Sequence, residues 1–213
     1  MVRFKDRRDA GKKLVSKLEK YKNNPDAIVI GLPRGGVVTA LEVAKALQLP
    51  LDIIVPRKIA CPMQPELAVG ALTQEGEPFF DEKLMRSMGV TKKDLQEVVQ
   101  RERKEAARRI ALYRENRPPL DLENKIAIIV DDGIATGATM LAAIKSAKNL
   151  GAQKIVAAVP VSPAESLKKI EKEVDEVIFL DTPAPFWGVG GFYDLFLQTE
   201  DDEVVAIMRE FDA

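Results

Sequence analysis

Residues 126–140 read IAIIVDDGIATGATM and lead from an apolar strand, through two acidic residues, into a turn rich in glycine and threonine. The first five residues are apolar without polar alternation, which is typical of a parallel strand covered on both faces. Asp131 and Asp132 therefore fall at the carboxyl end of that strand. The small residues that follow let several backbone N–H groups approach one anion, and a helix beginning near Gly137 points its positive end toward the same place.

Helix capping alone would explain the glycines and threonines of this turn, because such residues are common where helices begin. It does not explain Asp131 and Asp132, since adjacent carboxylates beside an anion site repel each other and the ligand unless a cation or sugar hydroxyls engage them. The chain contains neither GxxxxGK[ST] nor GxGxxG, so a Walker-type ATPase and a simple dinucleotide site are not supported. The pattern indicates a site for a sugar phosphate.

The segment VDDGIATGAT, residues 130–139, resembles the phosphoribosyl pyrophosphate signature of the type I phosphoribosyltransferases. The resemblance implies that Asp131 and Asp132 contact the ribose 2′ and 3′ hydroxyls, directly or near a magnesium ion. Both acids are therefore expected as catalytic groups and as indirect Mg²⁺ ligands. The resemblance also implies that small residues wrap the 5′-phosphate, namely Ala135, Thr136, Gly137, Ala138 and Thr139. Gly133, which precedes them, is expected to bind the substrate too.

Strands and helices alternate along most of the chain. We expect strands at residues 27–32, 51–55, 126–130, 154–159 and 177–180, and helices at 7–21, 37–47, 138–150, 164–172 and 201–211. Such alternation implies right-handed crossovers and a parallel sheet flanked by helices on both faces, which is the α/β fold of the family that the chain resembles. We expect one domain over residues 1–213, with an inserted lid at 56–119 and a hood segment at 181–199.

A second loop of the right chemistry follows the strand at residues 27–32. It contains Pro33, Arg34, Gly35 and Gly36, in which the arginine offers a forked donor and the glycines allow close approach of an anion. A tight turn that merely tolerates Arg34 is the alternative. In the resembled family a loop at this position holds pyrophosphate, often through a nonproline cis peptide. Open parallel sheets bind ligands at this edge, so the two loops are expected to form one site.

The lid is expected to contain a hairpin, with strands at 68–73 and 77–80, and a long helix capped by Thr91. Arg57 and Lys58 directly follow the strand at 51–55, and the resemblance implies closure there over a departing pyrophosphate. The helix carries an apolar stripe and an opposite charged face, interpreted as solvated surface with i to i+4 pairing in preference to an RNA-binding surface. The charged face contains Arg101, Arg103, Lys104, Arg108 and Arg109.

The hood segment combines proline, glycine and aromatic residues without helical or strand periodicity. Phe186, Trp187, Phe192 and Tyr193 could stack on a planar base, with the first two expected at the acceptor. They could equally fill the core or a dimer contact, and the sequence leaves these readings open.

Composition limits the remaining possibilities. The 213 residues carry 32 basic and 33 acidic side chains, so the net charge of -1 argues against nucleic acid or an anionic membrane as a partner. The chain has no histidine, which removes Ser-His-Asp and Cys-His chemistry, and Cys61 is expected to be an incidental loop residue. Without an apolar leader or a spanning run, we expect a cytoplasmic protein. Family habit implies a homodimer.

These observations predict transfer of ribose 5-phosphate from phosphoribosyl pyrophosphate to a nitrogen nucleophile, such as a nucleobase, with release of pyrophosphate. A sensor of the same ligand that acts through RNA or DNA is the alternative, supported by the basic helix and opposed by the balanced charge. Pyrophosphokinase chemistry would need an ATP site that the sequence does not show. The acceptor cannot be identified from the hood.

Overall fold

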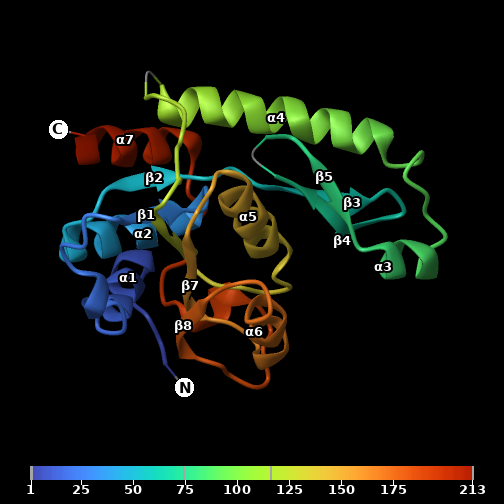
Figure 1. Cartoon of the computed structure of the whole chain (residues 1–213). Helices are drawn as coiled ribbons and strands as arrows, with labels where there is room; N and C mark the ends of the chain where they lie inside the picture. The colour runs from blue at the N-terminus through green and yellow to red at the C-terminus, as the bar shows by residue number, and fades with distance from the viewer. Residues whose placement is uncertain (1, 74, 116, 213) are drawn as a thin grey trace.

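The computed structural model describes residues 2–73, 75–115 and 117–212 of the chain. Its main sheet has five parallel strands in the order β2-β1-β6-β7-β8 (Figure 1). The strands are β1 (Ala27–Gly31), β2 (Leu51–Ile53), β6 (Ile126–Val130), β7 (Lys154–Val161) and β8 (Glu176–Asp181). The strand order runs outward in opposite directions from the adjacent pair β1 and β6. The predicted parallel α/β fold is confirmed.

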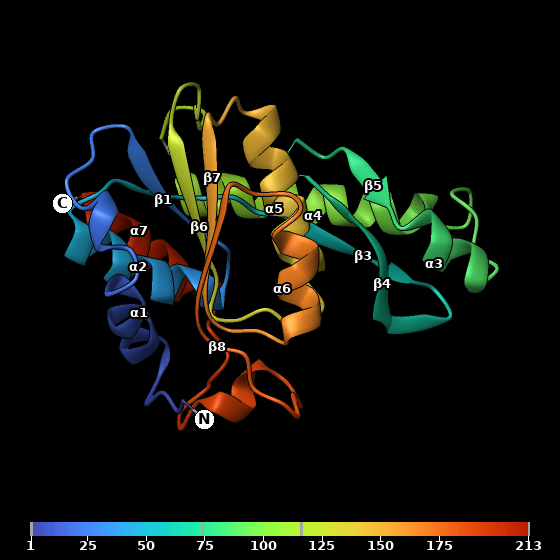
Figure 2. The same cartoon turned by 60° about the horizontal axis from the view of Figure 1, so that its bottom comes forward.

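Helices cover both faces of this sheet (Figure 2). One face carries α1 (Arg7–Val15), α2 (Gly35–Leu47) and α7 (Asp201–Asp212), and the other carries α5 (Ala138–Asn149) and α6 (Ala164–Ile170). Ile128 and Val130 of β6 pack into the core on the first face, whereas Ala127 and Ile129 pack into the core on the second. A strand buried on both faces explains why its sequence is continuously apolar.

The predicted boundaries hold to within a few residues in these elements, with one exception near the N-terminus. The helix predicted at residues 7–21 ends at Val15 and is followed by a short 3₁₀ helix, η1 (Glu19–Tyr21). The Ser16 hydroxyl donates a hydrogen bond of 2.9 Å to the Lys13 carbonyl, a local bond that competes with helix continuation. Leu14 before the break and Leu18 and Tyr21 after it are nevertheless all buried.

Residues 56–119 are the predicted lid, and those of them that the structure describes form a smaller layer beside the main sheet. The lid contains β3 (Arg57–Cys61), β4 (Gln64–Leu72), β5 (Pro78–Phe80), α3 (Glu82–Ser87) and α4 (Gln96–Arg114). Its strands form an antiparallel sheet in the order β3-β4-β5. Figure 1 shows α4 running across this sheet and on to α7. A separate hydrophobic core, with Ile59, Leu72 and Leu95 among its residues, holds the lid together.

The predicted hairpin is present as β4 and β5, although residue 74 in its turn lies outside the described part of the chain. The sequence reading missed β3 and α3, because both are short and β3 follows directly after Pro56. It was also wrong about Cys61, which ends β3 and is fully buried in the lid core. Cys61 follows Ile59 by two residues in β3, and both belong to the lid core.

Two predictions about the lid helix were also wrong. Thr91 does not cap α4, which begins at Gln96; its backbone N–H and hydroxyl instead donate to the Asp94 carboxylate, at 2.8 and 2.6 Å. Arg109 is not on a solvated face, because its side chain is only 16% exposed and lies 2.6 Å from Glu105. A helix predicted to begin after Thr91 did not indicate that one edge of its charged face is turned toward the main domain.

The hood segment, residues 181–199, contains a short 3₁₀ helix, η2 (Val189–Phe192), and packs on the N-terminal segment. Phe4, Phe192 and Tyr193 share a small core there. The predicted closing helix is present as α7. None of the helices described is both long and apolar enough to cross a membrane.

Candidate functional site

The two predicted ligand loops lie side by side at the carboxyl edge of the main sheet. β1 and β6 are neighbours, with Gly31 opposite Val130, so the loops that leave them start together. A β-carbon on Gly35 would lie 2.1 Å from an Asp132 oxygen, and one on Gly36 would lie 2.6 Å from an Asp131 oxygen. Glycine is therefore required at both positions for the loops to touch.

We expect Gly36→Ala to destabilise the protein by about 1–2 kcal/mol. The added carbon would meet the Asp131 α-carbon at 2.9 Å as well as its carboxylate, and such overpacking costs about 1–3 kcal/mol. The better helix propensity of alanine offsets at most about 1 kcal/mol. Gly191→Ala is the control because nothing lies within 4 Å of its added carbon. Equal urea midpoints for the two variants would show that the loops do not touch in solution.

A cavity of about 180 Å³ opens beside these loops. Asp131 lines it from the end of β6, Lys58 from the lid and Val189 from the hood. The remaining lining residues belong to one continuous segment, Gly133, Ile134, Ala135, Thr136, Gly137, Ala138, Thr139 and Met140. The structure thus brings an acidic side chain, a cation and the whole predicted phosphate loop to one small cavity.

The predicted phosphate loop, residues 133–139, is fixed by hydrogen bonds from outside it. The Ile134 N–H donates to the Val161 carbonyl at 2.9 Å, and the Ser166 hydroxyl donates to the Ala135 carbonyl at 2.6 Å. Gly137 caps α5 with a φ of +87°, a left-handed conformation that glycine adopts without strain. The first turn of α5 therefore points its free N–H groups at the loop.

The two adjacent acids differ in their surroundings. Asp131 lines the cavity, whereas Asp132 is turned toward α1 and lies 2.6 Å from the Arg7 guanidinium. The side chains of Arg7 and Asp132 are only 12% and 14% exposed, so this ion pair is mostly shielded from water. A larger share of its electrostatic energy is retained than in a surface pair. Asp131 is the acid that a ligand in the cavity would meet first.

The pKa values of both acids are raised by their surroundings. Burial, and then the charge of Asp132, raise the pKa of Asp131 well above its ordinary value of 3.8. Burial also raises the pKa of Asp132, although the Arg7 charge and hydrogen bond oppose that rise. A site that destabilises ionised acids in this way favours the arrival of a cation or of hydroxyl donors.

Arg7 was missed by the sequence reading, which placed it on an ordinary amphipathic helix. Its guanidinium also lies 3.8 Å from the ring centre of Phe196 and donates to the Leu197 carbonyl at 2.6 Å. The Tyr193 hydroxyl donates to the Asp132 carbonyl. Arg7 in α1 and Asp132 are 125 residues apart in the sequence. The hood residues that contact them lie still further along the chain. No local sequence pattern could reveal contacts of such long range.

Arg34 occupies the predicted loop, but its side chain does not reach the cavity. The Pro33–Arg34 peptide is cis, as the resemblance implied. The Arg34 guanidinium lies 2.9 Å from Glu200 and 3.7 Å from Asp201, at the start of α7. The loop backbone is thus beside the acidic pair while the arginine side chain is held at the rim.

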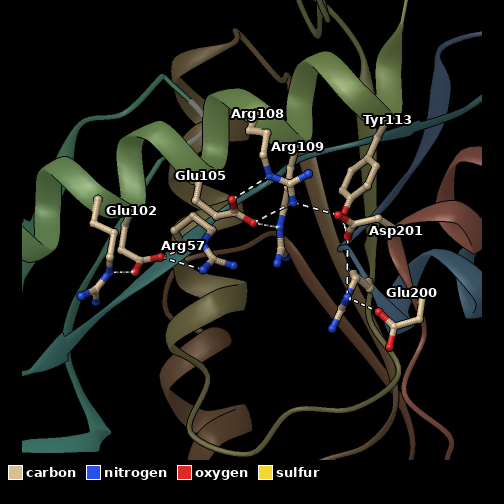
Figure 3. Close-up of polar contacts among 10 residues, drawn as sticks. Arg57, Glu102, Glu105, Arg108, Arg109, Tyr113, Glu200 and Asp201 are labelled. Atoms are coloured by element: carbon tan, nitrogen blue, oxygen red, sulfur yellow. Dashed lines mark hydrogen bonds and ion pairs between the residues drawn. The ribbon is translucent and has the colours of Figure 1, made fainter.

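The two predicted lid cations, Arg57 and Lys58, make different contacts. Lys58 is exposed and lines the cavity, whereas Arg57 pairs with Glu102 of α4 at 2.7 Å (Figure 3). This division follows from strand geometry, since adjacent residues of β3 point to opposite faces. Of these two residues, Lys58 is the one that lines the cavity beside the predicted phosphate loop.

The aromatic residues predicted at the acceptor stand apart from the cavity. Trp187 is 90% exposed, and the Phe186 ring lies 5.2 Å from that of Phe192. Neither lines the cavity; Val189 does, and its methyl groups cover Gly133. Phe192 and Tyr193 are buried, which agrees with the core reading of the hood for these two residues.

The carboxylates beside the cavity are the candidate ligands for magnesium. Within the residues that the structure describes, no three acidic or cysteine side chains gather into a metal cage. Magnesium usually keeps several waters and is shared between one or two carboxylates and the phosphates of a substrate. One cavity-facing carboxylate with a neighbouring acid fits that shared mode of binding.

Comparison with known proteins gives a consistent result. A family model described as "Phosphoribosyl transferase domain" matches residues 5–194. A Mycobacterium tuberculosis (strain ATCC 25618 / H37Rv) protein named "Putative phosphoribosyl transferase Rv0571c" is 44% identical over 208 residues. The match includes 98% of this chain but 47% of that protein, so the chain spans about half the length of the curated relatives it matches.

Solved structures agree in fold. The crystal structure of TT1426 from Thermus thermophilus is 36% identical, covers 99% of both chains and has a TM-score of 0.83. A hypothetical protein from Neisseria gonorrhoeae, at 13% identity and a TM-score of 0.51, shares the fold alone. The similarity to TT1426 extends over the lid and hood as well as the main sheet.

Proposed function

Because this chain belongs to the phosphoribosyltransferase family, we propose that it transfers ribose 5-phosphate from phosphoribosyl pyrophosphate to a nitrogen nucleophile, with release of pyrophosphate. The observation that carries the proposal is the cavity of about 180 Å³ in which Asp131 and Lys58 face the phosphate loop. Its position at the carboxyl edge, between the adjacent strands β1 and β6, is where open parallel sheets bind ligands.

In the proposed complex, the phosphate loop binds the 5′-phosphate through backbone N–H groups and the hydroxyls of Thr136 and Thr139. Asp131 accepts hydrogen bonds from the ribose hydroxyls and stabilises positive charge on the ring as the bond to pyrophosphate breaks. The negative charge of Asp132 helps to stabilise the same positive charge on the ring, and its pair with Arg7 fixes its orientation. No histidine is needed for any of these roles.

The leaving group is proposed to bind along the loop from Pro33 to Gly36. Lys58 lies on the lid side of the cavity and can follow the negative charge that develops there. Arg34 and Arg57 are near the same edge but pair with carboxylates, and their contribution requires those pairs to open. Magnesium, when bound, would supply further positive charge to the pyrophosphate.

The first test is calorimetric titration with phosphoribosyl pyrophosphate in the presence of magnesium, followed by a pyrophosphate-release screen over nucleobases and small amines. We expect saturable binding of the activated sugar and release with at least one acceptor. Ribose 5-phosphate and inorganic pyrophosphate should each bind more weakly and compete with the complete ligand, because each occupies only one of the two loops.

Two results would contradict the proposal in different ways. The absence of any heat with the activated sugar would remove the ligand assignment itself. Tight binding without pyrophosphate release for any acceptor tested would instead favour a sensor. The acceptor class would follow from whichever compound promotes release.

A further inference from the structure

A line of ion pairs runs along the inner side of α4 and ends at Arg34. Figure 3 shows Arg57 beside Glu102, Glu105 paired with both Arg108 and Arg109, and Asp201 below Tyr113. The distances are 2.7 Å for Arg57–Glu102, 2.8 Å for Arg108–Glu105 and 2.6 Å for Arg109–Glu105. Each of these arginines at the lid side of the site therefore has a carboxylate partner.

Asp201 is held firmly within this line. It accepts a hydrogen bond from the Tyr113 hydroxyl and another from Arg108, the latter at 2.8 Å, both from α4. These two bonds lower the pKa of Asp201, so it stays ionised. Its distance to Arg34 is longer, at 3.7 Å. Asp201 therefore ties the lid helix to α7 first and contacts Arg34 second.

Glu200 is held differently. It lies 2.9 Å from Arg34, and its other side-chain partner among the described residues is Gln198, at 2.7 Å. Its side chain is 64% exposed, whereas that of Arg34 is 24% exposed. An ion pair with one member in water is weak and opens readily.

The position of Arg34 makes that weak pair important. Arg34 precedes the first turn of α2, a helix of 13 residues whose free N–H groups and positive end lie at the same loop. An anion at this loop would lie beside the Arg34 backbone and would attract the guanidinium that is paired with Glu200. The carboxylate and the anion therefore compete for one cation.

We propose that Glu200 is an internal competitor for the pyrophosphate group, which keeps Arg34 at the rim until a ligand displaces it. The inference rests on the proposed function, because it concerns the same pyrophosphate loop. Asp201 remains bound to α4 during the exchange, so only Glu200 leaves. In this role Glu200 is a positioning residue that sets ligand affinity and takes no part in bond breaking.

The test is to titrate inorganic pyrophosphate with magnesium into the wild-type protein, Glu200→Gln and Asp202→Asn. We expect Glu200→Gln to bind about two- to five-fold more tightly, the range that corresponds to the loss of one exposed ion pair. Asp202→Asn removes the same charge two residues further on, in the first turn of α7, at an exposed residue outside the line of ion pairs. It should change the affinity less. Added salt should narrow the difference between Glu200→Gln and the wild type.

A double-mutant cycle separates competition from a general change in charge. In an Arg34→Gln background, adding Glu200→Gln should no longer tighten binding, because the competed cation is gone. Unchanged affinity in Glu200→Gln, or equal tightening by Asp202→Asn, would overturn the inference. So would tightening that persists without Arg34.

Different results would contradict the proposed function and the competitor role of Glu200. If the wild-type protein and every variant bind neither pyrophosphate nor phosphoribosyl pyrophosphate, the proposed function fails and takes the competitor role with it. If the wild-type protein binds both and Glu200→Gln behaves like the wild type, the proposed function stands and the competitor role alone is wrong.

Discussion

Asp131→Asn should weaken binding of magnesium phosphoribosyl pyrophosphate by about 10- to 100-fold, the usual cost of losing hydrogen bonds to a charged group. Turnover with a productive acceptor should fall further, by about 10²- to 10³-fold, because the carboxylate also stabilises charge that develops on the ribose. Calorimetry measures the first effect and pyrophosphate release the second. Asp131 is singled out because it lines the cavity, whereas Asp132 faces Arg7.

The same substitution should not destabilise the fold at neutral pH. An acid whose pKa is raised on folding stabilises the folded state below its ordinary value of 3.8, and that contribution is lost as pH rises through the higher folded value. Asparagine cannot ionise. The stability of Asp131→Asn relative to the wild type should therefore increase with pH across that window, as urea midpoints measured at several pH values would show.

Two comparisons make this prediction specific. Asp26→Asn changes the same charge at an exposed residue beside the opposite end of β1, and it should alter neither binding nor turnover. Asp132→Asn should also lose activity, because Arg7 then has no carboxylate partner beside the site. Normal binding and turnover in Asp131→Asn would remove the proposed role of the acidic pair.

The sequence predicted those parts of the site that are contiguous in the chain. The strand, the acidic pair and the phosphate loop of residues 126–140 follow one another, so local apolarity and small residues were enough to place them. The loop at Arg34 was found for the same reason. That the two loops touch depended only on β1 and β6 being neighbours, which the topology of open parallel sheets favours.

The remaining contacts depend on long-range packing and left no local signal. Arg7 reaches Asp132 from another helix, and Val189 closes the cavity from the hood. From its loop alone, Arg34 was predicted to bind the ligand. In the structure it pairs with Glu200, 166 residues away. The ends of α1 and α4 were misplaced because single side-chain hydrogen bonds, at Ser16 and Thr91, competed with the helical pattern.

A buried ion pair joins the lid helix to the main sheet. Arg114, near the end of α4, donates to both oxygens of Asp52 in β2, at 2.9 and 2.8 Å, and to the Pro118 carbonyl at 2.7 Å. Arg117 lies 3.7 Å from the same carboxylate. Asp52 and Arg114 are 9% and 8% exposed, so one carboxylate balances two arginines at a nearly dry junction.

Asp52→Ala should therefore destabilise the protein by about 3–5 kcal/mol, because it leaves guanidinium charge buried without a counter-ion. Urea denaturation measures the loss, and amide exchange should show α4 opening more often while β6 and β7 stay protected. Glu115→Gln is the matched control, since it disrupts an exposed pair with Arg209 at the same end of α4 and should change stability little. Because α4 also carries the partners of Arg57 and Asp201, loosening it should weaken ligand binding. An Asp52→Ala protein as stable as Glu115→Gln would mean that apolar packing alone attaches the lid helix.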